Sequence, residues 1–268
     1  MQTRSKLALV TGASKGIGEA FAQLLAEAGY RLVIVARNEG ELNRVAGVLT
    51  SKCETSVLPI GLDLCEPYAG AALAKELQGR ELVPDVIVNN AGFGLNGPAA
   101  DLPLDAQLAM IDVNVRVLTD LSLRFLPALI AGEGHRGIIN VASLSSYMPG
   151  PNMAVYHATK AYVLSFSEAL AAEVKGAGVT VTAVCPGPVP TGFQATAGIE
   201  ELRAYQWAPK RNARYVAQAG WHGFLRNDRV VLPGVETRLT AYVSRVTPHR
   251  LLVPLVHSAL DLRKPRPQ

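Results

Sequence analysis

The fold follows from residues 7–18, which read Leu7-Ala8-Leu9-Val10-Thr11-Gly12-Ala13-Ser14-Lys15-Gly16-Ile17-Gly18. An apolar run typical of a buried strand leads into a glycine-rich turn and then into a helix that opens near Gly16. Glycine permits a tight turn, a close approach of backbone to a pyrophosphate and close packing of helix on strand. The start of the helix directs free N–H groups and its positive dipole end at such a phosphate. The spacing G-x-x-x-G-x-G is a variant of the common dinucleotide fingerprint, and the alternative is a turn that binds nothing.

Downstream of this stretch, short apolar runs alternate with longer amphipathic ones. Further strands are predicted at residues 31–36, from 57–60 to near 63, at 85–88, at 137–141 and at 179–184, although Pro59 weakens the third. A long helix is predicted from about Leu104 to Ile130, disturbed at Pro127. Continuously apolar strands indicate a sheet that is buried on both faces. The pattern therefore predicts an α/β chain with one doubly wound parallel sheet and helices on both faces.

Composition excludes several classes of protein. The 268 residues are 49% hydrophobic and 18% charged, which allows a large core and argues against disorder. The three cysteines are scattered without a C-x-x-C pair, which favours a reducing compartment. The five histidines show no ligand spacing, so no catalytic metal is expected. Without a visible signal peptide or an apolar stretch of about 18 residues, a soluble cytoplasmic protein is expected.

Charge is distributed unevenly along the chain. From Arg203 onward there are twelve Lys and Arg against three Asp and Glu, whereas residues 1–202 hold fourteen against nineteen. The basic end is either a solvated tail or a surface attracted to an anionic partner. Nucleic acid is not expected as that partner, because no nucleic-acid motif accompanies the charge.

The end of the second predicted strand favours a phosphorylated cofactor. It reads Val35-Ala36-Arg37-Asn38, without the carboxylate that binds the ribose 2′-hydroxyl in NAD sites. Arg37 offers a planar fork suited to a phosphate, and Lys15 is a second cation on the same side. Together they favour NADP(H) over NAD(H), while the alternative for Arg37 is a solvated side chain.

Tyr156 and Lys160 lie four residues apart, and Tyr156 follows Ser143 by thirteen residues. On a helix, positions i and i+4 share a face, so the ammonium would lie beside the phenol. A nearby cation lowers the pKa of a tyrosine below its usual value, which suits proton exchange with an oxygen near neutral pH. The Ser143 hydroxyl could hold that same oxygen. The alternative to this catalytic pair is a surface tyrosine that packs over the lysine side chain. His157 follows Tyr156 directly, so on a helix it should point about 100° away from Tyr156.

These motifs occur in the order typical of one family, which the chain resembles over at least residues 6–192: the short-chain dehydrogenase/reductase family. The resemblance rests on Thr11 to Gly18, Asp63, Asn89-Asn90-Ala91-Gly92, Asn114, Ser143, Tyr156, Lys160 and Pro186-Gly187 with Thr191. It implies a compact, single-domain Rossmann-type fold. It also implies hydride transfer between a nicotinamide cofactor and a substrate carbon, with Tyr156 as acid and base. With the preference that Arg37 and Lys15 indicate, the expected cofactor is NADP(H) and the expected substrate is an apolar ketone, aldehyde or secondary alcohol.

The resemblance also implies individual roles. Asp63 and Leu64 would contact the adenine, Asn114 would bend the long helix and hold a water that links Lys160 to solvent, and Lys160 would bind the nicotinamide ribose. Turn or capping roles are the alternatives for Asp63 and the asparagines. The predicted catalytic residues are Asn114, Ser143, Tyr156 and Lys160. The predicted cofactor-binding residues are Gly12, Ser14, Lys15, Gly16, Ile17, Gly18, Arg37, Asp63, Leu64, Asn90, Ala91, Gly92, Tyr156, Lys160, Pro186, Gly187, Val189 and Thr191.

The substrate is predicted only by class. We expect a dinucleotide-binding and catalytic domain over residues 1–234, with a substrate loop at about 186–210. Apolar residues after Ser143 and in this loop suggest a pocket for an apolar carbonyl compound or alcohol, unless they pack in the core. They are Leu144, Met148, Met153, Phe193, Leu202 and Trp207.

Residues 235–268 are predicted to form a C-terminal amphipathic extension of two short helices divided by Pro248. This extension either touches a membrane surface weakly or packs against the domain or a neighbouring subunit. The resemblance implies a homodimer or homotetramer. The alternative functions are a non-catalytic NADP(H)-binding sensor or scaffold, and an enzyme that uses the same tyrosine for epimerisation or dehydration.

Overall fold

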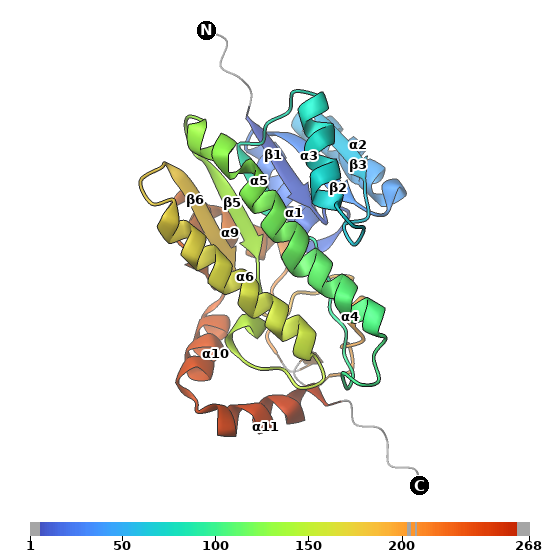
Figure 1. Ribbon diagram of the computed structural model, residues 1–268, viewed down its shortest axis with the longest axis vertical. Helices are drawn as coiled ribbons and strands as arrows, with labels where there is room; N and C mark the ends of the chain where they lie inside the picture. The colour runs from blue at the N-terminus through green and yellow to red at the C-terminus, as the bar shows by residue number, and fades with distance from the viewer. Residues whose placement is uncertain (1–5, 203–204, 207, 262–268) are drawn as a thin grey trace.

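One parallel sheet forms the centre of the protein in the computed structural model, which describes residues 6–202, 205–206 and 208–261. Within these residues the strand order is β3-β2-β1-β4-β5-β6-β7, and every neighbouring pair is parallel (Figure 1). The strands are β1 (Leu7–Thr11), β2 (Arg31–Ala36), β3 (Val57–Gly61), β4 (Val86–Asn89), β5 (Arg136–Val141), β6 (Val179–Val184) and β7 (Val230–Val231). The order reverses between β1 and β4, and such a reversal opens a crevice at the carboxyl ends of the strands.

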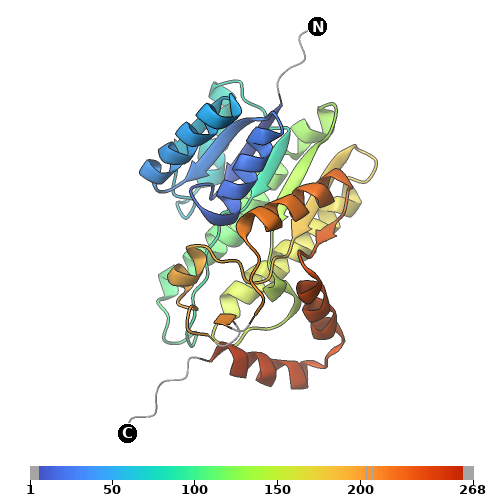
Figure 2. The ribbon, with the colours of Figure 1, turned by 180° about the vertical axis from the view of Figure 1, so that it is seen from behind.

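Helices cover both faces of the sheet, as predicted. On one face, α1 (Gly16–Glu27), α2 (Glu39–Cys53) and α9 (Ala213–Leu225) pack on one apolar core (Figure 2). On the other face, α3 (Ala69–Gly79), α5 (Leu118–Ala131) and α6 (Ala154–Glu173) pack on a second core (Figure 1). The central strands are buried on both faces, which explains their continuously apolar sequences.

Pro59 is accommodated because β3 is the edge strand of the sheet. Ser56 accepts a hydrogen bond from Leu32 of β2, so alternate residues of β3 face β2 and Pro59 is among those that face away. The missing N–H of Pro59 therefore removes no bond of the ladder.

The long helix is disturbed, but not where the sequence suggested. It divides into α4 (Leu104–Ile111), a wider π-helical segment η1 (Asp112–Val117) and α5. Pro127 lies inside α5 without ending it, so the disturbance predicted at Pro127 is wrong. The widened segment surrounds Asn114, in agreement with the bend that the family resemblance implied, and such segments are frequent at functional sites.

The last part of the chain forms helices below the carboxyl end of the sheet (Figure 1). A short α7 (Phe193–Ala197) follows β6, and α10 (Val235–Val246) and α11 (His249–Leu260) are the two helices predicted on either side of Pro248. The predicted domain boundary at residue 234 stays a prediction. Among the described residues, no helix has the length and apolar character needed to cross a membrane.

Candidate active site

A cavity of about 800 Å³ lies along the carboxyl edge of the sheet. It extends from the glycine-rich turn at the start of α1 to the inner side of α7 and α11. Nearly all predicted site residues line it: Gly12, Ser14, Lys15, Gly16, Ile17, Arg37, Asp63, Leu64, Asn90, Ala91, Gly92, Ser143, Tyr156, Lys160, Pro186, Gly187, Val189 and Thr191. Gly18 and Asn114 are the two predicted residues that do not line it.

The glycine-rich turn leaves the start of α1 open toward the cavity. Gly12 and Gly16 adopt φ angles of 64° and 65°, which favour glycine. The N-cap residue Lys15 makes no side-chain cap hydrogen bond, so the first N–H groups of α1 remain available to a ligand. A Cβ atom at Gly12 would lie 2.9 Å from the Ala91 Cα, so the turn sits directly against the end of β4. This arrangement fits a pyrophosphate group.

Gly18 supports the turn from behind instead of facing the cavity. A Cβ atom at Gly18 would collide with the Gly12 carbonyl oxygen and the Asn90 amide. Gly18 is predicted from the sequence to contact a cofactor, but the structure gives it a packing role. Because Gly18 has no side chain, α1 can approach β1 and β4 closely.

Thr11 and Asn90 hold the turn against β4. The Thr11 hydroxyl accepts hydrogen bonds of 3.0 Å from the backbone N–H groups of Asn90 and Ala91. The Asn90 amide donates to the carbonyl oxygens of Thr11 and Gly12, at 3.0 and 3.1 Å. Thr11 was not among the predicted site residues, although a polar residue that ends an apolar strand was a signal for it.

The end of β2 places Arg37 beside Asp63. The Arg37 Nη1 atom lies 3.9 Å from the Asp63 Oδ2 atom, and the Arg37 side chain is 65% exposed. Asp63 also accepts a 2.9 Å hydrogen bond from the backbone N–H of Cys65, which is the turn role considered as its alternative. The Lys15 side chain extends along Gly192, in the loop after β6. The structure therefore places Arg37, and not Lys15, beside Asp63.

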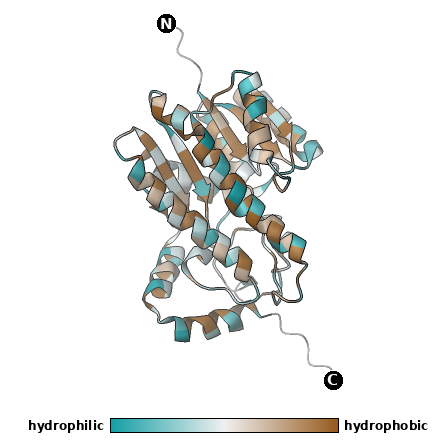
Figure 3. Cartoon of the chain, in the orientation of Figure 1, coloured by the Kyte–Doolittle hydropathy of each residue, from teal (hydrophilic) through white to brown (hydrophobic). Residues whose placement is uncertain are grey.

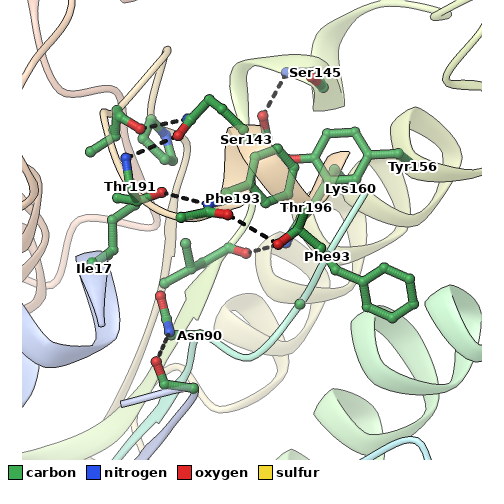
Figure 4. Close-up of a pocket in the computed structure, with 18 of the residues that line it drawn as sticks. Ile17, Asn90, Phe93, Ser143, Ser145, Tyr156, Lys160, Thr191, Phe193 and Thr196 are labelled. Atoms are coloured by element: carbon green, nitrogen blue, oxygen red, sulfur yellow. Dashed lines mark hydrogen bonds between the residues drawn. The ribbon is translucent and has the colours of Figure 1, made fainter. Parts of the chain in front are cut away.

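Ser143, Tyr156 and Lys160 meet in the middle of the cavity, as predicted (Figure 4). Ser143 precedes the short helix η2 (Leu144–Tyr147), and the other two residues lie one turn apart on α6. The Ser143 hydroxyl accepts a 3.1 Å hydrogen bond from the Ser145 N–H and lies near enough to the Tyr156 phenol to lower its pKa. The Lys160 Nζ atom donates to the Val141 carbonyl oxygen at 2.8 Å and lies 6.0 Å from the centre of the Tyr156 ring.

Burial governs the pKa values of this group. Burial raises the pKa of Tyr156 to about 12, against the opposing effect of the nearby Ser143 hydroxyl. Burial also lowers the pKa of Lys160 to about 8. The prediction that Lys160 holds the pKa of Tyr156 below its usual value is therefore wrong for this structure. The ammonium is bonded to Val141 and faces the ring, so loss of hydration dominates at the phenol.

Asn114 lies behind the cavity wall and joins three elements. Its side chain is fully buried, accepts from the Phe93 N–H at 3.2 Å and donates to the Phe93 carbonyl oxygen at 3.0 Å. It also donates to the Thr159 hydroxyl of α6 at 3.0 Å. A Cβ atom at Gly92 would lie 2.7 Å from its Oδ1 atom and 3.6 Å from the Lys160 Nζ atom, so both groups flank Gly92. The water that Asn114 was expected to hold stays a prediction.

His157 lines the cavity, which its position next to Tyr156 did not suggest. Its Nδ1 atom lies 2.8 Å from the Met148 carbonyl oxygen, and its ring fills the space beside Gly150. Burial lowers the pKa of His157, so the imidazole is neutral at pH 7. The ring thus fastens the loop between η2 and α6, and no local sequence pattern distinguishes this role from that of a surface histidine.

The far end of the cavity has an apolar wall. The predicted residues Leu144, Met148, Met153, Phe193 and Leu202 line it, whereas Trp207 lies outside the described residues. The Phe193 ring lies 5.4 Å from the Tyr156 ring. Helix α11 completes this wall with three residues that sequence reasoning did not assign to the pocket: Val256, Ala259 and Leu260.

Comparison with known families agrees with this geometry. A family model described as short chain dehydrogenase matches residues 6–201. The chain belongs to the short-chain dehydrogenase family. An uncharacterised oxidoreductase of Staphylococcus aureus is 35% identical over 192 residues, which make up 71% of this chain and 81% of that relative.

Solved short-chain dehydrogenases share the fold over most of the chain. A short-chain dehydrogenase from Sphingobium yanoikuyae in complex with NADPH is 30% identical, with a TM-score of 0.79, and the match covers 88% of this chain and 92% of that one. The bulky-bulky ketone specific alcohol dehydrogenase from Comamonas testosteroni is 27% identical, with a TM-score of 0.75 and coverages of 87% and 88%. This short-chain dehydrogenase is therefore an oxidoreductase with a Rossmann-type fold. The open start of α1 and the close contact of Gly12 with Ala91 fit the dinucleotide that such neighbours bind.

Proposed function

We propose that the protein is an NADP(H)-dependent oxidoreductase that interconverts an apolar ketone or aldehyde with the corresponding alcohol. The observation that carries this proposal is that Ser143, Tyr156 and Lys160 line one cavity together with the open start of α1. The NADPH complex and the ketone specificity named for the two solved relatives support it. The apolar wall of α7 and α11 suits a substrate with a hydrophobic body.

In the reducing direction, Tyr156 donates its phenolic proton to the substrate carbonyl oxygen, and Ser143 holds that oxygen by a hydrogen bond. When bound, NADPH would supply the hydride that the carbonyl carbon receives, and the product would be an alcohol. Lys160 binds the nicotinamide ribose and keeps a positive charge near the phenolate that remains. Asn114 fixes the position of α6 through Thr159 and thereby the position of Tyr156 and Lys160.

The rest of the cavity holds the cofactor in this proposal. The N–H groups at the start of α1 would bind the pyrophosphate, and Asp63 and Leu64 would contact the adenine. Asn90, Ala91 and Gly92 would lie beside the adenosine ribose. Four cavity-lining residues of the loop after β6 would hold the nicotinamide end: Pro186, Gly187, Val189 and Thr191.

The Arg37→Asp variant should weaken NADPH binding by about a hundredfold, because a charge-assisted phosphate contact becomes a repulsion. NADH lacks the 2′-phosphate, so its affinity should change by only a few-fold. Fluorescence titration with both cofactors measures the two losses. Arg80→Asp is the matched control, since Arg80 is an exposed arginine directly after α3 that does not line the cavity. Equal losses for NADPH and NADH would remove Arg37 from the 2′-phosphate site.

The two reaction directions should depend on pH differently. Since burial places the pKa of Tyr156 at about 12 and that of Lys160 at about 8, both groups are protonated near neutrality. Ketone reduction uses the phenol and should be nearly flat from pH of about 6 to 7.5. Alcohol oxidation needs the phenolate and should rise by up to about tenfold per pH unit over that range. Initial rates in both directions measure this, and a flat oxidation profile would contradict Tyr156 as the base.

Oxidation of NADPH against a panel of apolar ketones and aldehydes tests the activity itself. Turnover of any member establishes the reductase, and the panel then defines the pocket. Tight NADPH binding without turnover across a broad panel would favour the alternative, a sensor or scaffold that binds the cofactor. The intact set of Ser143, Tyr156 and Lys160 favours the enzyme.

We further propose a homodimer or homotetramer that pairs through the long helix and α6. Several large apolar residues are exposed on these helices: Leu108, Ile111, Leu123, Ile130 and Tyr162. Sedimentation equilibrium of the purified protein gives its mass in solution. Besides a second copy of the chain, the proposed partner is the substrate, an apolar carbonyl compound or alcohol.

A further inference from the structure

Helix α10 exposes its large apolar residues instead of burying them against the protein. The stripe buried against the protein consists of three small residues, two of them polar: Thr237, Ala241 and Ser244. The outward stripe contains Val235, Leu239, Tyr242 and Val246, which are 75%, 62%, 66% and 60% exposed. A surface helix normally buries its apolar stripe and exposes its polar one. The inverted arrangement indicates that something covers the outward side.

Helix α11 extends this feature. Leu251 and Leu255 lie one turn apart and are 62% and 66% exposed, while Leu252 and Val256 are buried. Both helices lie at the end of the molecule opposite to α2 and α3 (Figure 1), and hydrophobic and hydrophilic residues are interleaved on them (Figure 3). We call the exposed apolar residues the C-terminal apolar face: Val235, Leu239, Tyr242, Val243, Val246, Leu251 and Leu255.

The charges on the same two helices are almost all positive. Exposed Arg238, Arg245 and Arg250 lie among the apolar residues. Glu236, the one carboxylate of α10 and α11, is bound to Arg211 by contacts of 2.7 and 3.0 Å. In the sequence, residues 261–268 add three basic residues against one acidic residue. The exposed charges that accompany the C-terminal apolar face are therefore positive.

We propose that the C-terminal apolar face docks on an anionic lipid surface. Two copies of this face packed together would bring their arginines close to one another, which costs energy. Acidic headgroups attract the arginines, and the boundary between headgroups and acyl chains accommodates the leucines, the valines and the amphipathic tyrosine. The lipid surface thus matches both the charge and the apolar character of the face.

Docking in this orientation would bring the substrate end of the cavity close to the lipid. The outward residues of α11 belong to the face, and its inward residues Val256, Ala259 and Leu260 line the cavity. Only one helix then separates the lipid surface from the site of Tyr156. This consequence rests on the proposed function and implies lipophilic substrates that dissolve in the membrane.

Co-sedimentation of the full chain with vesicles tests the docking without any turnover. The vesicles are phosphatidylcholine alone or phosphatidylcholine mixed with phosphatidylglycerol. We expect binding to the mixed vesicles that is weakened by salt, and little binding to the neutral ones. The double variant Leu239→Asp/Tyr242→Asp should lose at least about tenfold in partition coefficient. Tyr68→Asp is the matched control, because Tyr68 is 83% exposed at the start of α3 and far from α11.

Three results would overturn the docking. They are no sedimentation with either vesicle, equal binding by the double variant and the wild type, and an equal loss in the Tyr68→Asp control. If the double variant instead lowers the oligomeric mass and leaves vesicle binding unchanged, the face belongs to a second copy. NADPH titration of the same samples shows whether each variant is folded. Failure of docking is thereby separated from failure of the proposed activity.

Discussion

The Tyr156→Phe variant is expected to lose turnover by about three orders of magnitude or more, because general acid and base catalysis contributes on that scale. The phenylalanine ring keeps the packing against Phe193, where the two rings lie 5.4 Å apart. The variant lacks only the phenolic hydroxyl, which supplies the proton in the proposed reaction. NADPH affinity should therefore stay within a few-fold of the wild type. Single-turnover rates and fluorescence titration measure the two quantities separately.

Tyr162→Phe is the matched control for this result. Tyr162 lies on the same helix, is 41% exposed and shares a 3.0 Å hydrogen bond with the Thr119 hydroxyl. Its replacement removes a hydroxyl from α6 but none from the cavity, so turnover should change little. Retained activity in Tyr156→Phe would rule out the assigned mechanism, and a similar loss in both variants would point to a general effect on α6.

The Gly18→Ala variant is expected to lose about 1–3 kcal/mol in free energy of unfolding, the usual cost of forcing atoms into a packed site. The added methyl group would collide with the Gly12 carbonyl oxygen and the Asn90 amide, and Gly12 belongs to the rigid turn. Displacing the turn also misplaces the N–H groups at the start of α1. NADPH affinity should therefore fall by at least about tenfold, although Gly18 does not line the cavity.

Gly47→Ala separates this steric effect from the general effect of replacing glycine. Gly47 lies inside α2, and a Cβ atom there would meet nothing within 4 Å. Alanine in a helix interior should stabilise the protein by up to about 1 kcal/mol. Urea unfolding curves give the free energies of unfolding, and cofactor titration gives the affinities. Unchanged stability and affinity in Gly18→Ala would show that α1 and β4 can separate without cost.

Local patterns predicted those parts of the fold that are built from contiguous residues. The strands β1, β2, β4, β5 and β6 follow from continuous apolar runs, because a strand buried on both faces leaves no place for an alternating pattern. Pro59 argues against the third strand in the sequence alone, since the sequence does not show that β3 is an edge strand where proline is tolerated. The site residues at strand ends and at the start of α1 can also be predicted from the sequence. Parallel strands bring their carboxyl ends to one edge of the sheet, so residues that follow different strands gather there.

The position of the disturbance in the long helix cannot be predicted from local sequence. Proline is the commonest cause of a helix disturbance, so Pro127 was the natural choice from the residues alone. In the fold, the disturbance lies at Asn114, whose partners Phe93 and Thr159 are distant in sequence. Those hydrogen bonds exist only after β4 and α6 have packed beside η1, and no window of the sequence contains them.

By itself, the sequence determined that this chain folds as a doubly wound parallel sheet with a glycine-rich turn after its first strand, and that Tyr156 and Lys160 lie one helical turn apart, because periodicity and short spacings are local properties. Only the tertiary structure decided the pKa of Tyr156, which burial raises to about 12 although a lysine lies one turn away. It also decided that α11 forms a wall of the cavity and that α10 turns its apolar stripe outward. Burial and the direction of a helix face depend on what packs against the chain from elsewhere.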